Sequence, residues 1–209
     1  MALTLRMSPT PPNTWGKVMR LLYVISSLAL VSCAASGAKT VERDAAITSA
    51  KRMLDGNLWT TKNLALGGDG TYCFGGKQAN CARYGRLHTW EAAIKACRSL
   101  GAGWRLPTDD DWKRLAVLYG GLYGDPSDPA KTAYASLRLG SGAGFDVQLG
   151  GNRTETGDYK RLEAHGFYWS ATETGPRSAW FYNFGQASPL PNRHDHGSKE
   201  MAISVRCVK

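Results

Sequence analysis

Several motifs that mark common enzyme and binding classes are missing from this 209-residue chain. It has no Gly-x-Ser-x-Gly elbow, no phosphate-binding loop and no Rossmann fingerprint, which disfavours the enzyme classes that those motifs define. No Cys-x-x-Cys pair occurs, so a zinc site is disfavoured as well. A net charge of +9 favours acidic partners such as sulfated glycans, anionic lipid or nucleic acid. Because no run of lysine or arginine carries that charge, we prefer plain solubility as its explanation and expect no nucleic-acid partner.

The composition that is present is that of a globular domain. Hydrophobic residues make up 43% of the chain and charged residues 21%, both ordinary values. The 24 glycines and 7 tryptophans predict a loop-rich fold with aromatic packing. One domain plus a tail is expected at this length.

The N-terminus has the pattern of an export signal. Arg20 precedes an apolar stretch, residues 21–32, that is shorter than the ~20 residues a spanning helix needs. Leu30-Val31-Ser32-Cys33 resembles a bacterial lipobox, so residues 1–33 are predicted to be a lipoprotein signal peptide with Cys33 as the lipidated residue. Ala34 then implies the outer membrane or cell surface. An uncleaved anchor is the alternative, which the serines of this region weaken.

The remaining cysteines are Cys73, Cys81, Cys97 and Cys207. An even number in an exported chain predicts two disulfides, with three possible pairings.

Residues 34–53 are predicted to be a tether and residues 54–209 the folded domain. Thr89 is the expected N-cap of a helix over residues 90–100, and Thr108 that of a second helix. Cys97 lies on the apolar face of the first helix. The three aspartates at 109–111 are expected to stabilise the second helix start, in preference to forming a metal site.

Beyond a long loop at residues 121–144, strands are predicted at 145–149, 167–172, 179–184 and 201–208. In the last of these, Ile203, Val205 and Cys207 share one face. Cys97 and Cys207 therefore both point inward, which favours a Cys97–Cys207 bond and leaves Cys73–Cys81 to close a local loop.

Four segments in this order carry a family resemblance: residues 84–93 (YGRLHTWEAA), 103–108 (GWRLPT), 168–173 (YWSATE) and 205–208 (VRCV). Together they resemble the Fibrobacter succinogenes major paralogous domain and the C-terminal domain of the Legionella collagen-like adhesin. The resemblance implies an α+β, C-type-lectin-like fold related to formylglycine-generating enzymes, with two helices, small antiparallel sheets and long loops. It also implies a disulfide between the first helix and the terminal strand.

The segment after Thr172 is similar to the variable region of proteins that diversity-generating retroelements target. That resemblance implies a displayed ligand-binding surface over residues 174–196. The candidate ligand-binding residues are Thr174, Arg177, Trp180, Phe181, Tyr182, Asn183, Gln186, Ser188, Leu190, Asn192, Arg193, His194, Asp195 and His196.

Three consecutive aromatics, Trp180-Phe181-Tyr182, lie within this surface. Because neighbouring strand residues face opposite sides, we expect at least Phe181, or else Trp180 and Tyr182 together, to be exposed or partly exposed. Replacing Phe181, Leu190, Arg193 and His194 together by alanine is then expected to leave stability nearly unchanged, whereas Trp104 and Trp169 should be core residues.

Catalytic and metal-dependent alternatives are disfavoured. His194 and His196 share a side of an extended segment, but no third metal ligand is evident. The calcium-binding motifs of C-type lectins are not matched, and two disulfides would consume the thiols that formylglycine-generating chemistry needs. We therefore expect a monomeric, non-enzymatic protein without metal or cofactor that binds an unknown protein or glycan. A non-variable adhesin for acidic glycans is the alternative, and an enzyme of the formylglycine-generating type is a remote third.

Overall fold

A computed structural model describes residues 37–47, 49–122, 133–138, 140–186, 188 and 191–209. The chain divides into two compact units, residues 1–38 and 39–209. Of the first unit only residues 37 and 38 are described, and they belong to a helix over residues 37–47. Cys33 and the expected signal peptide lie outside the described residues. No helix in the described part of the chain is long and apolar enough to span a membrane.

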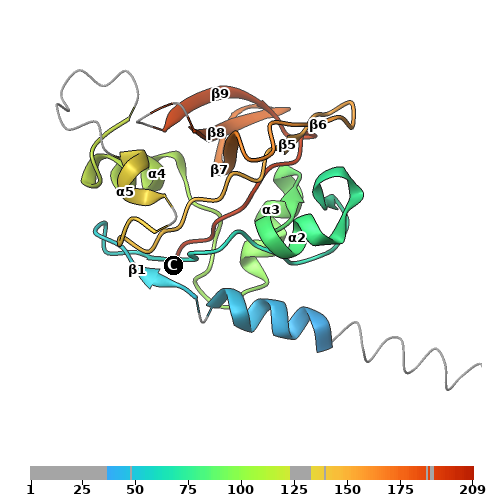
Figure 1. The fold of residues 1–209 in the computed structure, drawn as a ribbon, viewed down its shortest axis with the longest axis horizontal. Coiled ribbons are helices and arrows are strands. Elements are labelled where there is room, and N and C mark those ends of the chain that lie inside the picture. Colours follow the sequence, from blue (N-terminus) through green and yellow to red (C-terminus); the bar gives the residue numbers. More distant parts are fainter. Residues whose placement is uncertain (1–36, 48, 123–132, 139, 187, 189–190) are drawn as a thin grey trace, which may run out of the picture. The chain divides into compact units, whose positions relative to one another are not determined.

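The second unit is an α+β domain, as predicted (Figure 1). After the helix at 37–47, its elements are β1 (Lys51–Arg52), β2 (Leu58–Trp59), β3 (Thr71–Tyr72), the 3-10 helix η1 (Phe74–Gly76), α2 (Gln78–Tyr84), β4 (Leu87–His88), α3 (Trp90–Arg98), α4 (Asp109–Leu118), α5 (Ala133–Leu137), β5 (Asn152–Arg153), β6 (Tyr159–Lys160), β7 (His165–Gly175), β8 (Ser178–Gly185) and β9 (Asn192–Ser198).

The strands form small antiparallel sheets. β1 pairs with β2, β3 with β4, and β5 with β6. The largest sheet has the order β7-β8-β9, in which Tyr168 lies opposite Tyr182 and Tyr182 opposite Arg193. β7 and β8 correspond to two predicted strands. β9 lies where no strand was predicted.

The two expected helices are present as α3 and α4. At α4, Thr108 and Asp111 form a capping box, in which each side chain accepts a hydrogen bond from the other residue's backbone N–H. Thr89 occupies the N-cap position of α3, although its side chain makes no cap hydrogen bond. The helical elements η1, α2 and α5 are present in addition to the two that were predicted. α5 lies within the segment expected to be a long loop.

Two predicted strands are not regular strands. In the first, over residues 145–149, only Val147 forms an isolated bridge, and Asp146 has a positive φ of 53°. In the second, over residues 201–208, single residues bridge to different partners: Ile203 to His88, Ser204 to Tyr168 and Val208 to both Trp59 and Arg105. This terminal segment runs between separate parts of the domain, so both of its faces are buried.

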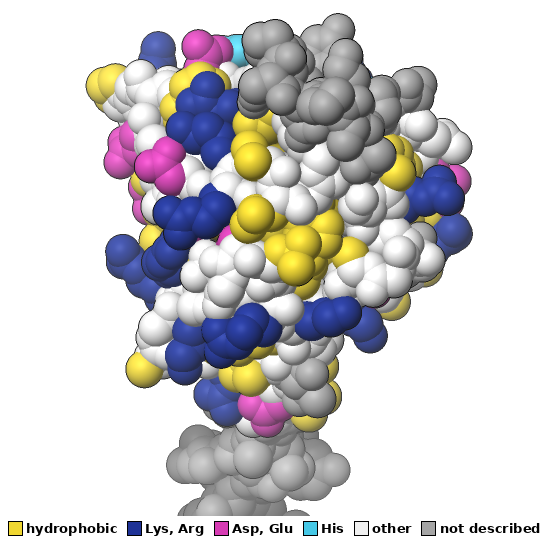
Figure 2. Space-filling view, turned by 90° about the vertical axis from the view of Figure 1, so that its left-hand side faces the viewer, with side chains coloured by type: hydrophobic (Ala, Val, Ile, Leu, Met, Phe, Trp, Pro, Cys, Tyr) yellow, Lys and Arg dark blue, Asp and Glu magenta, His cyan; other side chains and the backbone are white. Residues whose placement is uncertain are grey.

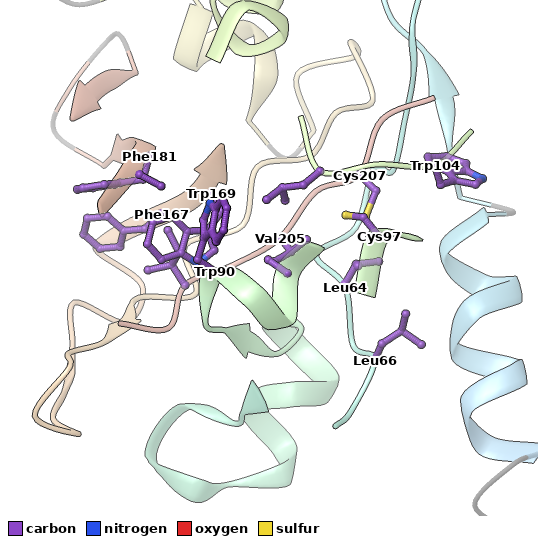
Figure 3. Close-up of a cluster of buried hydrophobic side chains, with 14 of the residues drawn as sticks. Leu64, Leu66, Trp90, Cys97, Trp104, Phe167, Trp169, Phe181, Val205 and Cys207 are labelled. Carbon is purple, nitrogen blue, oxygen red and sulfur yellow. A yellow bond between two sulfur atoms is a disulfide. The ribbon is translucent and has the colours of Figure 1, made fainter. Parts of the chain in front are cut away.

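Two hydrophobic clusters lie on opposite faces of the β7–β8 pair. One contains Phe167, Trp169 and Phe181 with Trp90 and Val205 (Figure 3). The other contains Tyr168, Tyr182 and Phe184 with Trp112 and Trp59. Successive residues of these strands thus point alternately into the two clusters. Trp104 and Trp169 are core residues as expected, with 6% and 0% of their surface exposed.

Both expected disulfides are formed. Cys97 of α3 bonds to Cys207 near the C-terminus within the first cluster (Figure 3), and Cys73 bonds to Cys81 of α2. The first bond ties positions 110 residues apart, so it joins the helix to the terminal segment.

Arg206 is a fully buried arginine at the centre of the domain. Its guanidinium donates hydrogen bonds to Asn63 Oδ1 and to the carbonyl oxygens of Thr60, Phe145 and Asp146, at 2.6–3.0 Å. Burial lowers the pKa of Arg206. Four acceptors from two separate segments replace its hydration, so this side chain holds the terminal segment to the loop around Asp146.

The folded part begins before Leu54. Lys51 and Arg52 pair with β2, and Met53 is buried with only 4% of its surface exposed. Ala46, Ile47 and Ala50 pack against the first cluster. The end of the expected tether, residues 49–53, therefore belongs to the domain.

Candidate functional site

The β8–β9 region holds most of the predicted ligand-binding residues. The structure exposes some of them and buries others. Thr174, Arg177, Gln186, Asp195 and His196 are exposed. Ser188, Asn192 and His194 are partly buried. Leu190 lies outside the described residues.

The aromatic triplet exposes one ring, that of Trp180, but the expected exposure of Phe181, or of Trp180 and Tyr182 together, was wrong. Phe181 has 8% of its surface exposed and Tyr182 has 0%, while Trp180 is partly exposed. The reason is that both faces of the sheet are covered. Phe181 packs with Trp169, and Tyr182 stacks on Trp112 with ring centroids 5.3 Å apart. Phe181 and Tyr182 are therefore framework residues.

Asn183 is also part of the framework. Only 7% of its surface is exposed, and its Oδ1 lies 2.9 Å from Nδ1 of His165. His165 in turn stacks on Phe167. The pair links β7 to β8 through their side chains.

The side chain of Arg193 is held in place by the buried carboxylate of Asp109. Its Nε and Nη2 donate to Oδ1 and Oδ2 of Asp109 at 2.7 and 2.6 Å, and the Asp109 side chain is only 6% exposed. Tyr182 donates to Oδ1 of Asp109 at 2.7 Å, and Lys113 pairs with its Oδ2 at 3.1 Å. Burial alone would raise the pKa of Asp109, but these hydrogen bonds outweigh it and hold the pKa below the usual range.

The same arginine covers Trp180. Its guanidinium carbon lies 3.3 Å from the centroid of the indole ring, a close cation–π contact. Trp180 and Arg193 lie on the α4 side of the sheet, and they form a fixed, partly exposed aromatic–cation pair.

The opposite side of β9 carries the two histidines. His194 stacks on Phe181 with ring centroids 4.8 Å apart, and His196 lies edge-on to both rings. Burial and the neighbouring His196 lower the pKa of His194. Within the described ranges, no three His, Cys, Asp or Glu side chains gather in a way that could hold a metal ion.

The domain has two pockets that are lined largely by residues that the sequence did not single out, and the first of them adjoins the β7-β8-β9 sheet. A pocket of about 280 Å³ is lined by Asn152, Thr154, Lys160, Arg161, Phe167, Phe181, His196, Met201 and Ile203. A second, of about 400 Å³, is lined by Arg83, Tyr84, Tyr134, Arg138, Val147, Gln148, Leu149 and Glu163. No sequence pattern marks either set, because each is assembled from distant segments.

Positive charge is spread over the surface. Figure 2 shows lysine and arginine side chains around a central hydrophobic patch on one face, with fewer acidic side chains. This arrangement fits the chain's net charge of +9.

Comparison with known proteins assigns the domain. No curated protein and no solved structure matches the chain. The model of the Fibrobacter succinogenes major domain matches residues 48–209, which include β1, both disulfides and the C-terminal sheet. The resemblance carried by the four sequence segments is thereby confirmed, and the chain belongs to the Fibrobacter succinogenes major domain family.

Proposed function

We propose that this protein is a lipid-anchored display protein of the bacterial cell surface, which binds a protein or glycan ligand through the β8–β9 region and catalyses no reaction. The observation that carries the proposal is the Trp180–Arg193 pair. Its two side chains are in contact at 3.3 Å, and two hydrogen bonds to Asp109 fix the arginine. Groups that are already fixed lose little conformational freedom when a ligand binds, and tryptophan and arginine are the side chains most often dominant in interfaces.

The surrounding scaffold supports this role. The sheet is packed on both faces, and Cys97–Cys207 ties the terminal segment to α3. The exposed positions Thr174, Arg177, Gln186 and Asp195 contribute to neither cluster. Changes there leave the core packing intact, as a display surface requires.

The proposal includes diversification by a retroelement, but at fewer positions than the sequence suggested. Phe181, Tyr182 and Asn183 are buried, and Arg193 neutralises a buried carboxylate. Variation at these four positions would disturb folding, so it should concentrate at the exposed positions. This part of the proposal is tested in the neighbouring DNA, where it predicts a reverse transcriptase gene and an imperfect repeat of the last codons.

The ligand test uses the purified full chain on an array of glycans and bacterial surface proteins. The wild-type protein should retain at least one ligand, and Trp180→Ala should weaken that binding by roughly 30-fold, as for an interface hot spot of about 2 kcal/mol. Leu54→Ala is the matched control, because Leu54 is 65% exposed and lies outside the C-terminal sheet. Equal binding by Trp180→Ala and wild type would place the site elsewhere.

A second candidate function is a non-variable adhesin for acidic glycans. The observation that favours it is the basic surface of Figure 2 together with the net charge of +9. Binding that is confined to acidic glycans on the array, with no retroelement nearby, would support this candidate over the first.

A further inference from the structure

The smaller pocket beside the sheet has an apolar floor and a positively charged rim. Phe167, Phe181 and Ile203 form its floor, with 6%, 8% and 0% of their surfaces exposed. Lys160 and Arg161 line one wall, and no aspartate or glutamate is among the lining residues. An anion that enters this pocket meets two cations and no lining carboxylate, and the lining residue His196 pairs with Asp195 at 3.2 Å.

The two cations of the rim have no acidic partner. Within the part of the chain that the structure describes, neither Lys160 nor Arg161 makes a side-chain hydrogen bond or an ion pair. The Arg161 guanidinium lies over the Phe167 ring, at 5.9 Å from its centroid, and its charge contributes to the lowered pKa of His194. By contrast, Arg105, Arg193 and Arg206 are all engaged by protein oxygens. The charge of Lys160 and Arg161 is therefore available to a ligand.

The backbone holds Arg161 in an unusual conformation. Its φ is +63°, in the left-handed region that non-glycine residues rarely adopt, and Glu163 has a φ of +61°. The turn is held by hydrogen bonds from His165 N to Arg161 O and from Glu163 N to Leu149 O, at 3.0 and 2.9 Å. Such conformations persist where the surrounding structure enforces them, and here the turn sets where the Arg161 side chain leaves the backbone.

Neutral polar groups complete the wall. The Asn152 amide lines the pocket and, among the described residues, makes no side-chain hydrogen bond. An amide offers both a donor and an acceptor, which suits a ligand hydroxyl group. The volume of about 280 Å³ is at the lower end of the range for small-molecule sites and fits a single ring.

From these features we infer that the pocket binds one sugar residue that carries a carboxylate. The carboxylate lies at Lys160 and Arg161, a hydroxyl group at Asn152, and the apolar C–H groups of the ring face the floor of the pocket. Phe181 points to the opposite side of the sheet from Trp180, so this site goes beyond the proposed display surface and gives the glycan-binding candidate a specific location.

The test titrates the purified full chain with galacturonic acid, its methyl ester and galactose, followed by calorimetry. For a ligand of this size, galacturonic acid should bind with a Kd on the order of 1 mM. The ester and galactose, which have the same ring without the charge, should bind at least tenfold more weakly. Equal binding of all three, or displacement of galacturonic acid by an equal concentration of inorganic phosphate, would overturn the inference.

Variants locate the binding. The double change Lys160→Gln with Arg161→Gln should reduce affinity for galacturonic acid at least tenfold. The double change Lys95→Gln with Arg98→Gln is the matched control, since it removes two exposed positive charges outside the pocket, and it should bind as wild type does. Wild-type affinity in the first double variant contradicts the inference.

Trp180→Ala separates this inference from the proposed function, because it changes the other face of the sheet. That variant should keep its affinity for galacturonic acid. An array ligand that depends on Trp180, together with no binding of galacturonic acid, would leave the display function standing and reject the sugar site. The reverse pattern would reject the display surface and support the sugar site.

Discussion

Asp109 and Arg193, which are 84 residues apart in the sequence, form a two-point ion pair between the first turn of α4 and strand β9. The pair therefore joins the start of a helix to a strand that was not predicted from the sequence. Because Arg193 also covers Trp180, one carboxylate organises both the sheet edge and the proposed ligand-binding surface. Four of the predicted ligand-binding residues have a structural role: Phe181, Tyr182 and Asn183, which are buried, and Arg193, which pairs with Asp109.

Replacing Arg193 by alanine should destabilise the domain. The change leaves the buried Asp109 without two charge-assisted hydrogen bonds, and we expect unfolding to become easier by about 1.5–3 kcal/mol. Urea denaturation with the disulfides intact measures this. Arg177→Ala, which removes an exposed arginine, should stay within about 0.5 kcal/mol of wild type. Similar stability of the two variants would show that the ion pair is dispensable.

Gly197→Ala should also destabilise the domain, because β9 lies close against the core at this position. A Cβ at Gly197 would lie 2.7 Å from Phe181 Cδ1 and 2.8 Å from the Ala179 carbonyl oxygen. Overpacking of this kind costs about 1–3 kcal/mol. The control is Gly68→Ala, where a Cβ meets nothing within 4 Å and should change stability by about 0.5 kcal/mol or less. Thermal melts of the two variants compare them directly, and equal melting temperatures would argue against the close packing of β9.

The burial of His88 in its neutral form should make the domain less stable in mild acid. The ring is fully buried, and burial lowers its pKa to about 4. Its Nδ1 and Nε2 each lie 3.1 Å from a carbonyl oxygen, of Arg86 and Leu66, so the neutral ring donates to only one of them. An unfolded histidine titrates near 6.5, so the unfolded state binds the extra proton and stability falls as the pH drops from about 6.5 to about 4.

The size of this loss of stability follows from the difference between the folded and unfolded pKa values of His88. A difference of about 2.5 pKa units corresponds to about 3 kcal/mol at full protonation. Urea midpoints at pH 7.5 and 4.5 measure it, and His88→Gln should flatten the dependence. Asp109 and Asp111, whose pKa values are lowered, contribute stability that is lost only as the pH falls below about 4, so the two windows separate. His194, whose pKa is also lowered, contributes stability that begins to be lost as the pH falls below about 6.5, so His194→Gln should also weaken the dependence. An unchanged slope in His88→Gln would reject the assignment.

Lipidation at Cys33 is the prediction that concerns localisation. The lipobox-like Leu30-Val31-Ser32-Cys33 predicts that the mature chain starts at Cys33 with lipid attached. Mass spectrometry of the membrane fraction should find that modified terminus, and Cys33→Ala should release the protein from the membrane. An unprocessed terminus, or membrane association that survives the substitution, would contradict the anchor.

Local signals explain which elements were predictable. Thr108 and the acidic turn after it specify a helix start from neighbouring residues alone, and α4 begins there. The inward faces of α3 and the terminal segment, set by periodicity, correctly paired Cys97 with Cys207. β9 gave no such signal, because Asn192-Arg193-His194-Asp195-His196 lacks the alternating apolar residues that mark a half-buried strand.

The sequence by itself determined the family, the α+β class, the two main helices, strands β7 and β8, and the disulfide pairs, because each depends on short-range spacing or on the face of one element. Only the tertiary structure decided which side chains are available to a ligand. The burial of Phe181 and Tyr182 depends on two cores that close over opposite faces of one sheet. The engagement of Arg193, the burial of Arg206 and the free charge of Lys160 and Arg161 likewise depend on partners that come from distant parts of the chain, and no local pattern contains that information.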